Sequence, residues 1–276
     1  MNLFNAVLSL LFLMPTLCAL PVGNCLSPDI FDHGLWDARD PYFSWGKCTH
    51  IRYGYYGDFV FNRDMEEITH GNPGPDIERL TLMTNGGSLT LDIQDFLDLF
   101  LVIGATKITY NMEGMFGDFA YFDFSTAFSW SLGAVLDLWH CGCFGLGMEA
   151  QYFQTKPLLD SYTNFATGQM IYFNHLNKMK WREWQGAITA TYQLIAVGDL
   201  LFAPYMGISA SSGKLRQYGF EFDDNGLTQT LNLLETKKLW GYALGLTVVS
   251  KGILGCTIEG RWADEKALYG AVQLSY

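Results

Sequence analysis

The sequence predicts an all-β fold, an antiparallel transmembrane β-barrel with an even number of strands, about 12 within a range of roughly 10 to 16. Three observations support this prediction: an apolar leader, no long apolar run after it, and period-2 alternation of apolar and polar residues. The 276 residues are 49% hydrophobic and 16% aromatic, with 29 glycines and 8 prolines. An exported chain of this composition suits a barrel, because a membrane strand needs only about ten alternating residues.

The first 19 residues indicate a secretory signal peptide. Residues 1–15 are uncharged and rich in Leu, Phe, Val and Met, and residues 16–19 (TLCA) resemble a cleavage region. A buried helix or a membrane anchor is the alternative, although the run is short for a membrane span of about 20 residues. We expect cleavage after Ala19, so that residues 20–276 form a single outer-membrane barrel domain.

Alternation is clearest in the segments 50–62, 183–194, 254–262 and 267–276. In the first of them one face carries only apolar side chains, namely Ile51, Tyr53, Tyr55, Phe59 and Phe61. Six further strands with weaker alternation are expected over 88–94, 98–110, 125–136, 143–155, 200–211 and 238–250.

The expected links between these strands differ in length, as in a barrel with short turns at one end and long loops at the other. Short links are expected near 94–95, 137–138, 198–199, 251–252 and 264–265. Long loops are expected over 63–87, 111–124, 156–180 and 212–236. The estimate exceeds ten strands because the last two loops have room for more, for example around 169–174.

Charged residues on the polar face are the candidates for lining a channel. They are Arg52, Asp58, Glu149, Glu183, Glu259 and Arg261. A porin discriminates among solutes by the diameter of its lumen and by the electric field of such charged groups. The alternative is that they pair with one another and fill a narrow barrel. Trp184, Tyr192, Trp262 and Tyr276 are expected in the aromatic girdles at the membrane interfaces.

The net charge is −11, which argues against nucleic acid as a partner. Five cysteines follow the leader, and this odd number leaves at least one thiol free or bonded to another chain in an oxidising compartment. These disulfide candidates are Cys25, Cys48, Cys141, Cys143 and Cys256. On a strand Cys141 and Cys143 would point the same way. A zinc site at His140 and these two thiols would need further ligands that the spacing does not supply.

A barrel hydrolase is a rival hypothesis, since such enzymes need a histidine with an Asp, Ser or Asn partner at the rim. No motif fixes a partner for any histidine of this chain. The histidines are His33, His50, His70, His140 and His175. We therefore expect neither a catalytic step nor a cofactor or metal.

Short segments along the whole mature chain resemble the chlamydial major outer membrane protein family of porins. These segments are 20–24 (LPVGN), 54–61 (GYYGDFVF), 138–143 (LWHCGC), 151–157 (QYFQTKP), 183–185 (EWQ) and 264–267 (DEKA). The chain is much shorter than that family's major protein, and of its N-terminal cysteine cluster only Cys48 is retained. The resemblance implies an outer-membrane porin joined to a disulfide-linked envelope.

The hypothesis from sequence is therefore a porin of the cell outer membrane that passes small hydrophilic solutes and ions. Its expected partners are outer-membrane lipid and those solutes. Disulfide-linked envelope proteins and further copies of the chain are additional candidates. A non-conducting structural barrel anchored by disulfides is the alternative, and a barrel hydrolase is the third reading.

Overall fold

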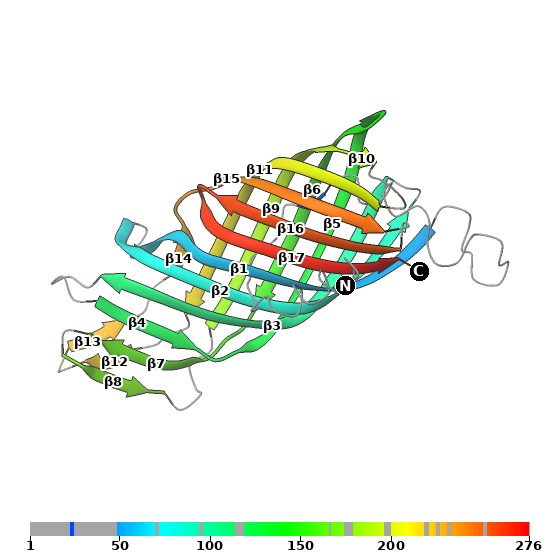
Figure 1. Ribbon diagram of the computed structural model, residues 1–276. Coiled ribbons are helices and arrows are strands. Elements are labelled where there is room, and N and C mark those ends of the chain that lie inside the picture. The colour runs from blue at the N-terminus through cyan, green and yellow to red at the C-terminus, as the bar shows by residue number, and fades with distance from the viewer. Residues whose placement is uncertain are drawn as a thin grey trace, which may run out of the picture.

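Ten strands close into an antiparallel barrel in the computed structural model (Figure 1). The structure describes residues 23–24, 49–69, 72–93, 96–113, 119–165, 167–173, 179–195, 200–217, 221–224, 227–230, 233–250 and 253–275. The wall strands are β1 (Thr49–Thr69), β2 (Asn72–Ile93), β3 (Leu97–Glu113), β5 (Ala127–Cys141), β6 (Phe144–Thr155), β9 (Met179–Tyr192), β11 (Leu200–Gln217), β15 (Trp240–Ser250), β16 (Leu254–Trp262) and β17 (Glu265–Ser275). No helix among the described residues is long and apolar enough to cross a membrane.

The barrel closes because β1 pairs with two neighbours. It pairs with β2 along one edge and with the last strand, β17, along the other. Each remaining wall strand pairs with the next wall strand in the chain. Because the ring of strands is closed, each described wall strand directs its backbone N–H and C=O groups to a neighbouring strand instead of to lipid.

All ten wall strands coincide with the ten segments predicted from alternation. The count of ten falls within the predicted range and below the estimate of 12. Residues 169–174 do contain a strand, β8 (Gln169–Tyr172), but it lies outside the barrel wall. It extends a small sheet that continues from β3 through β4 (Phe119–Phe124) and β7 (Leu159–Asn164).

Two expected connections are wrong. The turn between β5 and β6 is Gly142–Cys143, where Gly142 has a positive φ of 60° as a two-residue hairpin requires. Asp137, which suggested an earlier turn, instead accepts a hydrogen bond from the Trp139 amide (3.2 Å) at a β-bulge. The expected loop 63–87 is mostly strand, because β1 continues to Thr69 and β2 begins at Asn72.

The two ends of the barrel differ. We call the end that carries the β1–β2, β3–β5, β6–β9, β11–β15 and β16–β17 connections the loop end, and the opposite end the turn end. Most of the extra strands gather at the loop end (Figure 1): β4, β7, β8, β12 (Glu221–Asp224), β13 (Leu227–Thr230) and β14 (Leu233–Thr236). β14 bridges β1 and β11, and β10 (Leu194–Ile195) pairs with β11 at the turn end.

Apolar side chains cover the outer face, as the alternation predicts. Exposed aromatic rings form a band near each end, with Trp184, Tyr242 and Trp262 toward the loop end. Tyr192 and Phe144 are paired in register near the turn end. Trp184 and Tyr192 lie eight positions apart on β9, about 26 Å along the strand, which a tilt of about 40° reduces to about 20 Å of height, somewhat less than the apolar band of about 25 Å in outer-membrane barrels.

Phe59 is the least exposed of the five residues expected on this face, at 6%, and its ring stacks on Phe61 with centroids 5.9 Å apart. Tyr276, the fourth expected girdle residue, lies outside the described residues.

The interior of the loop end holds an apolar core. Its members come from the wall strands and from β4, β7 and β14, which cap this end. They are Val60, Met65, Ile77, Leu80, Leu82, Ile108, Tyr110, Ala120, Phe122, Phe124, Phe153, Leu159, Tyr162, Met179, Trp181, Leu215, Leu234 and Ala267. The barrel is therefore filled with apolar side chains near the loop end and with polar ones further along.

We predict that Gly104→Ala destabilises the barrel by about 1–3 kcal/mol. A Cβ at Gly104 would lie 2.1 Å from the Asn85 carbonyl oxygen and 2.8 Å from the Gly86 Cα, so β2 and β3 would have to separate. Urea unfolding in detergent micelles measures the loss. The control is Gly87→Ala, whose Cβ would come no closer than 3.8 Å to any such atom, and whose free energy of unfolding should not fall. Equal losses in the two variants would refute the steric explanation.

Candidate functional site

All six predicted channel-lining residues are buried in the barrel interior. Strand alternation places them opposite the exposed apolar side chains of the same strands. They come from four strands, namely β1 with Arg52 and Asp58, β6 with Glu149, β9 with Glu183, and β16 with Glu259 and Arg261. The structure brings most of them together in ion pairs.

Arg261 is the centre of the first ion-pair cluster. Its guanidinium lies 2.5 Å from the Asp58 carboxylate, 3.2 Å from Glu259 and 2.8 Å from Glu265. The Tyr205 hydroxyl donates to Glu259 Oε2 at 2.7 Å. This cluster joins β1, β11, β16 and β17 through buried charges.

Arg63 extends the cluster across the lumen. Its guanidinium donates to Glu265 and lies 2.6 Å from Glu183 Oε1, and it also stands over the Trp181 ring, 5.7 Å from the centroid. Since β1 and β9 are five strands apart in either direction around the ring, the Arg63–Glu183 pair spans the barrel's diameter. We call the group Asp58, Arg63, Glu183, Glu259, Arg261 and Glu265 the ion-pair network.

Sequence analysis missed Arg63 and Glu265. Arg63 was placed at the start of a loop and Glu265 in a short link. The bulge after Val60 hides Arg63, because it moves the inward positions of β1 from even to odd numbers. The signal for Glu265 is the alternation of β17, since position 265 continues the inward positions 267, 269 and 271. Beyond that bulge Arg63, Met65 and Glu67 are all buried.

A second ion pair lies nearer the turn end. Arg52 of β1 pairs with Asp98 of β3, and both side chains are buried. Glu149 of β6 is not a member of these ion pairs, and its Oε1 has no hydrogen-bond partner among the described residues.

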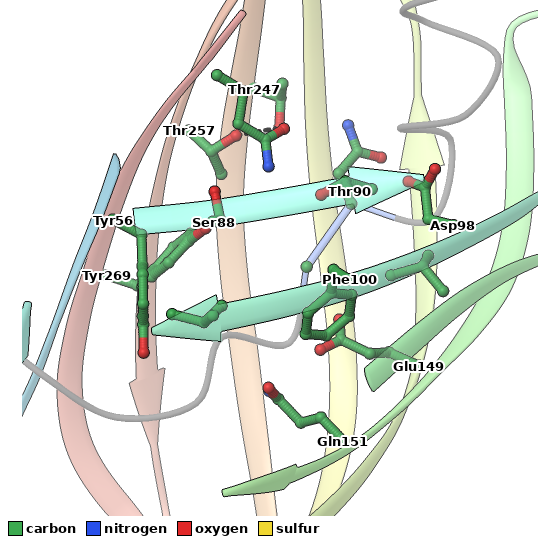
Figure 2. A pocket seen from close by; sticks show the side chains of 15 residues that line it. Tyr56, Ser88, Thr90, Asp98, Phe100, Glu149, Gln151, Thr247, Thr257 and Tyr269 are labelled. Carbon is green, nitrogen blue, oxygen red and sulfur yellow. Dashed lines mark hydrogen bonds between the residues drawn. The ribbon is translucent and has the colours of Figure 1, made fainter. Parts of the chain in front are cut away.

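A cavity of about 90 Å³ open to water occupies the lumen between these groups (Figure 2). Its wall combines polar side chains with aromatic and aliphatic ones. The lining residues are Gly23, Asn24, Tyr56, Ser88, Thr90, Asp98, Phe100, Val102, Val135, Glu149, Gln151, Thr247, Thr257, Tyr269 and Gln273. One water molecule needs roughly 10–15 Å³ of cavity volume, so this cavity has room for several.

Residues 23–24 reach this cavity from outside the strand framework. The Gly23 amide donates to Glu259 Oε2 at 3.0 Å, and Thr191 Oγ1 donates to Asn24 Oδ1 at 2.9 Å. A Cβ at Gly23 would lie 2.3 Å from Glu149 Oε2. Gly23 therefore lies between carboxylates of β6 and β16, which come from nearly opposite sides of the barrel.

The buried ionisable side chains are predominantly acidic. Nine carboxyl groups and three guanidinium groups are buried among the described residues, an excess of six acidic groups. The carboxylates are Asp58, Glu67, Asp92, Asp98, Glu149, Glu183, Glu259, Asp264 and Glu265. Part of the acidic side chains of this chain is thus buried in the barrel.

The cysteines lie in different environments. Cys141 and Cys143 flank Gly142 at the exposed β5–β6 hairpin, so the expectation that they share one face of a strand is wrong. Cys256 is half-buried in β16 on the same face as the exposed Ile258. Cys25 and Cys48 lie outside the described residues, as do the side chains of all five histidines. Among the residues that are described, no group of three or more His, Cys, Asp or Glu is arranged to hold a metal ion.

Asp264, in the turn between β16 and β17, has a pH-dependent role. Burial, together with the neighbouring Glu265 charge, raises the pKa of Asp264 from 3.8 to about 6. Its carboxylate accepts a hydrogen bond from Ser211 Oγ at 2.9 Å. Because the pKa is higher in the folded state, the unfolded state releases this proton first, and ionisation of Asp264 favours unfolding.

We predict that stability falls as pH rises from about 4 to about 6.5, and that Asp264→Asn removes up to about 3 kcal/mol of that decrease. Asparagine keeps an acceptor for Ser211 and carries no charge. Urea midpoints across this range for both proteins measure the difference. A variant whose stability follows the same pH curve as the parent would show that Asp264 does not titrate in this way.

The chain is similar to known outer-membrane proteins. The sequence profile of the family described as Chlamydia major outer membrane protein matches residues 2–72 and 119–176, which confirms the resemblance carried by the short motifs. The major outer membrane porin of Chlamydia muridarum is 25% identical over 393 aligned positions, covering 95% of this chain and 96% of that protein. The serovar E porin of Chlamydia trachomatis is 25% identical over 382 positions, with 95% of both chains covered.

The 276 residues of this chain fill only part of those alignments, so it is shorter than these relatives. Among solved structures, the outer membrane protease OmpT from Escherichia coli superimposes with a TM-score of 0.43 and 11% identity. That superposition covers 82% of this chain and 96% of the OmpT chain.

Proposed function

We propose that this chain, a divergent relative of the Chlamydia major outer membrane proteins, is an outer-membrane porin through which small hydrophilic solutes and ions diffuse passively. The observation that carries the proposal is the closed ring of ten strands, apolar outside and polar inside, with a water-accessible cavity in its lumen. The relatives that cover 95% of the chain are named major outer membrane porins.

The barrel crosses the outer membrane with its apolar face against lipid. Short turns of such barrels face the periplasm and long connections face the exterior, so the turn end is assigned to the periplasm. Residues 1–19 act as the signal peptide in this proposal, and residues 20–276 form the mature barrel. The Cys141–Cys143 hairpin then faces the periplasm.

The passage through this barrel is narrow. Eight- to ten-stranded barrels have lumens that their own side chains nearly fill, and here the ion-pair network spans the lumen below the loop-end core. We therefore expect a steep dependence of permeation on solute size, with diameter as the main filter and the acidic interior as the second.

Liposome swelling tests the proposal. Mature protein is reconstituted into liposomes, which are diluted into isotonic solutions of glycerol, arabinose, glucose and sucrose. Rapid swelling in glycerol and little or none in sucrose is the expected result. Liposomes whose inserted protein gives no swelling above protein-free vesicles in any of these solutes would overturn the proposal.

A second candidate is a structural barrel that does not conduct. The observation that favours it is the apolar core at the loop end, which joins strands from all around the ring. In this reading the exposed thiols of Cys141 and Cys143 link the barrel to envelope proteins. Absence of swelling, together with release of the protein from isolated envelopes by a thiol reductant, is the result that favours this candidate.

The proposal includes no catalytic step and no cofactor. Its support is that the relatives are named porins. The barrel-hydrolase reading depends on the histidines, and none of their side chains belongs to the site described above.

A further inference from the structure

The Glu149 carboxylate is a buried group directed into the luminal cavity. The residue is 4% exposed, and its Oε1 has no hydrogen-bond partner among the described residues. Figure 2 shows the side chain among the residues that line the cavity. Leaving a buried carboxylate oxygen unsatisfied is costly, so this geometry favours a ligand that donates hydrogen bonds and carries positive charge.

The guanidiniums of the lumen are already engaged with other carboxylates. Arg52 pairs with Asp98, and Arg261 contacts Asp58, Glu259 and Glu265. Glu259 also accepts hydrogen bonds from Tyr205 and from the Gly23 amide. The Glu149 carboxyl group thus lies in an interior in which carboxyl groups already outnumber guanidiniums.

The rest of the wall suits an ammonium group. Tyr56 and Tyr269 line the cavity with ring centroids 6.0 Å apart, and Phe100, which also lines it, packs against the cluster that contains these two rings (Figure 2). Aromatic faces attract cations, most strongly where water is scarce. Thr90 and Gln151 add neutral oxygen atoms that can accept hydrogen bonds. An anion would not be attracted by the aromatic faces or by the acceptor oxygen atoms, and the excess of acidic groups in the lumen would repel it.

We propose that the luminal cavity binds a small organic cation with a primary ammonium group, with Glu149 as its counter-ion and Phe100 beside it. The inference deepens the proposed porin function, because it names cationic amines as solutes that the lumen retains during passage. The cavity volume of about 90 Å³ limits the bound part to an ammonium group and a few carbon atoms.

Isothermal titration calorimetry with methylammonium chloride tests the site on the folded mature barrel in detergent. We expect saturable binding by the parent protein and at least about tenfold weaker binding by Glu149→Gln, which keeps the size of the side chain and removes its charge. Glu66→Gln is the matched control, since Glu66 lies on β1 beyond the bulge and does not line the cavity. It should bind within about twofold of the parent.

Phe100→Leu gives an independent check should Glu149→Gln fail to fold. It removes the aromatic face and leaves the carboxylate, and binding should weaken by about three- to tenfold. Absence of saturable methylammonium binding by the parent, or parental affinity in Glu149→Gln or in Phe100→Leu, would overturn the proposal.

Calorimetry does not require the barrel to conduct, so the two proposals fail separately. A protein that binds methylammonium but gives no liposome swelling retains the cation site and loses the porin function. A protein that gives swelling but binds no methylammonium retains the porin function and loses the cation site.

Discussion

Replacing Arg63 with alanine should destabilise the folded barrel by about 3–5 kcal/mol. The Arg63 guanidinium is buried between Glu265 and Glu183 and lies over Trp181. Its removal leaves the buried Glu183 carboxylate without a cationic partner and Glu265 with Arg261 alone, and it deletes the contact that spans the lumen. The measurement is the urea midpoint of unfolding in detergent micelles or lipid vesicles at neutral pH.

The control for this prediction is Lys214→Ala. Lys214 pairs with Glu235 at 2.7 Å, but both side chains are partly exposed, so the loss should stay below about 1 kcal/mol. Adding Glu183→Gln to Arg63→Ala removes the stranded carboxylate and should recover part of the lost stability. A double variant less stable than Arg63→Ala alone would contradict the assignment of the loss to an unpaired Glu183 carboxylate.

Trp181→Ala should raise single-channel conductance several-fold. Trp181 is 0% exposed, belongs to the loop-end core, and donates from Nε1 to Glu183 Oε2 at 3.2 Å. Its ring fills space in the lumen next to Arg63, so removing it opens the section that the loop-end core fills. The same change removes a large buried side chain and should cost about 3–5 kcal/mol of stability.

Trp184→Ala is the matched control on the same strand. Trp184 faces outward and is 65% exposed, so its loss changes the lipid contact and leaves the lumen as it was. Its conductance should equal that of the parent. A Trp181→Ala protein that inserts with parental conductance would show that the passage is not limited at the loop-end core.

Alternation alone was enough to predict the membrane wall. Every wall strand must present apolar side chains to lipid and mostly polar ones to the interior, so the period-2 pattern of 183–194 and 254–262 translates directly into inward Glu183, Glu259 and Arg261. The same alternation predicts that the side chains of Arg52, Asp58 and Glu149 face the barrel interior.

The loop end could not be predicted in the same way, because lipid does not impose a pattern there. β1 and β2 continue beyond the membrane through charged and glycine-rich sequence, which resembles a loop by composition. A bulge changes which residues of β1 face inward, and this hid Arg63 from the alternation argument. The entry of Gly23 into the lumen depends on long-range contacts with Glu259, for which no local sequence signal exists.

The sequence also could not predict which charged residues pair with one another. The two readings of the inner face, a channel lining and a set of mutually paired groups, both describe part of the structure. Arg261 and Arg63 join the ion-pair network, whereas the Glu149 Oε1 lies at the cavity without a described hydrogen-bond partner. Which carboxylate lies outside the ion-pair network depends on the order of the strands around the ring.

Single-channel recording of residues 20–276, refolded and inserted into a planar bilayer, tests the central claim most directly. We predict discrete current steps that favour cations over anions in a KCl gradient, because buried carboxylates outnumber guanidiniums in the barrel. Reversing the charge at Glu259 or Arg261 should shift the reversal potential. A chain that inserts and never conducts would contradict the porin and leave a structural barrel in its place.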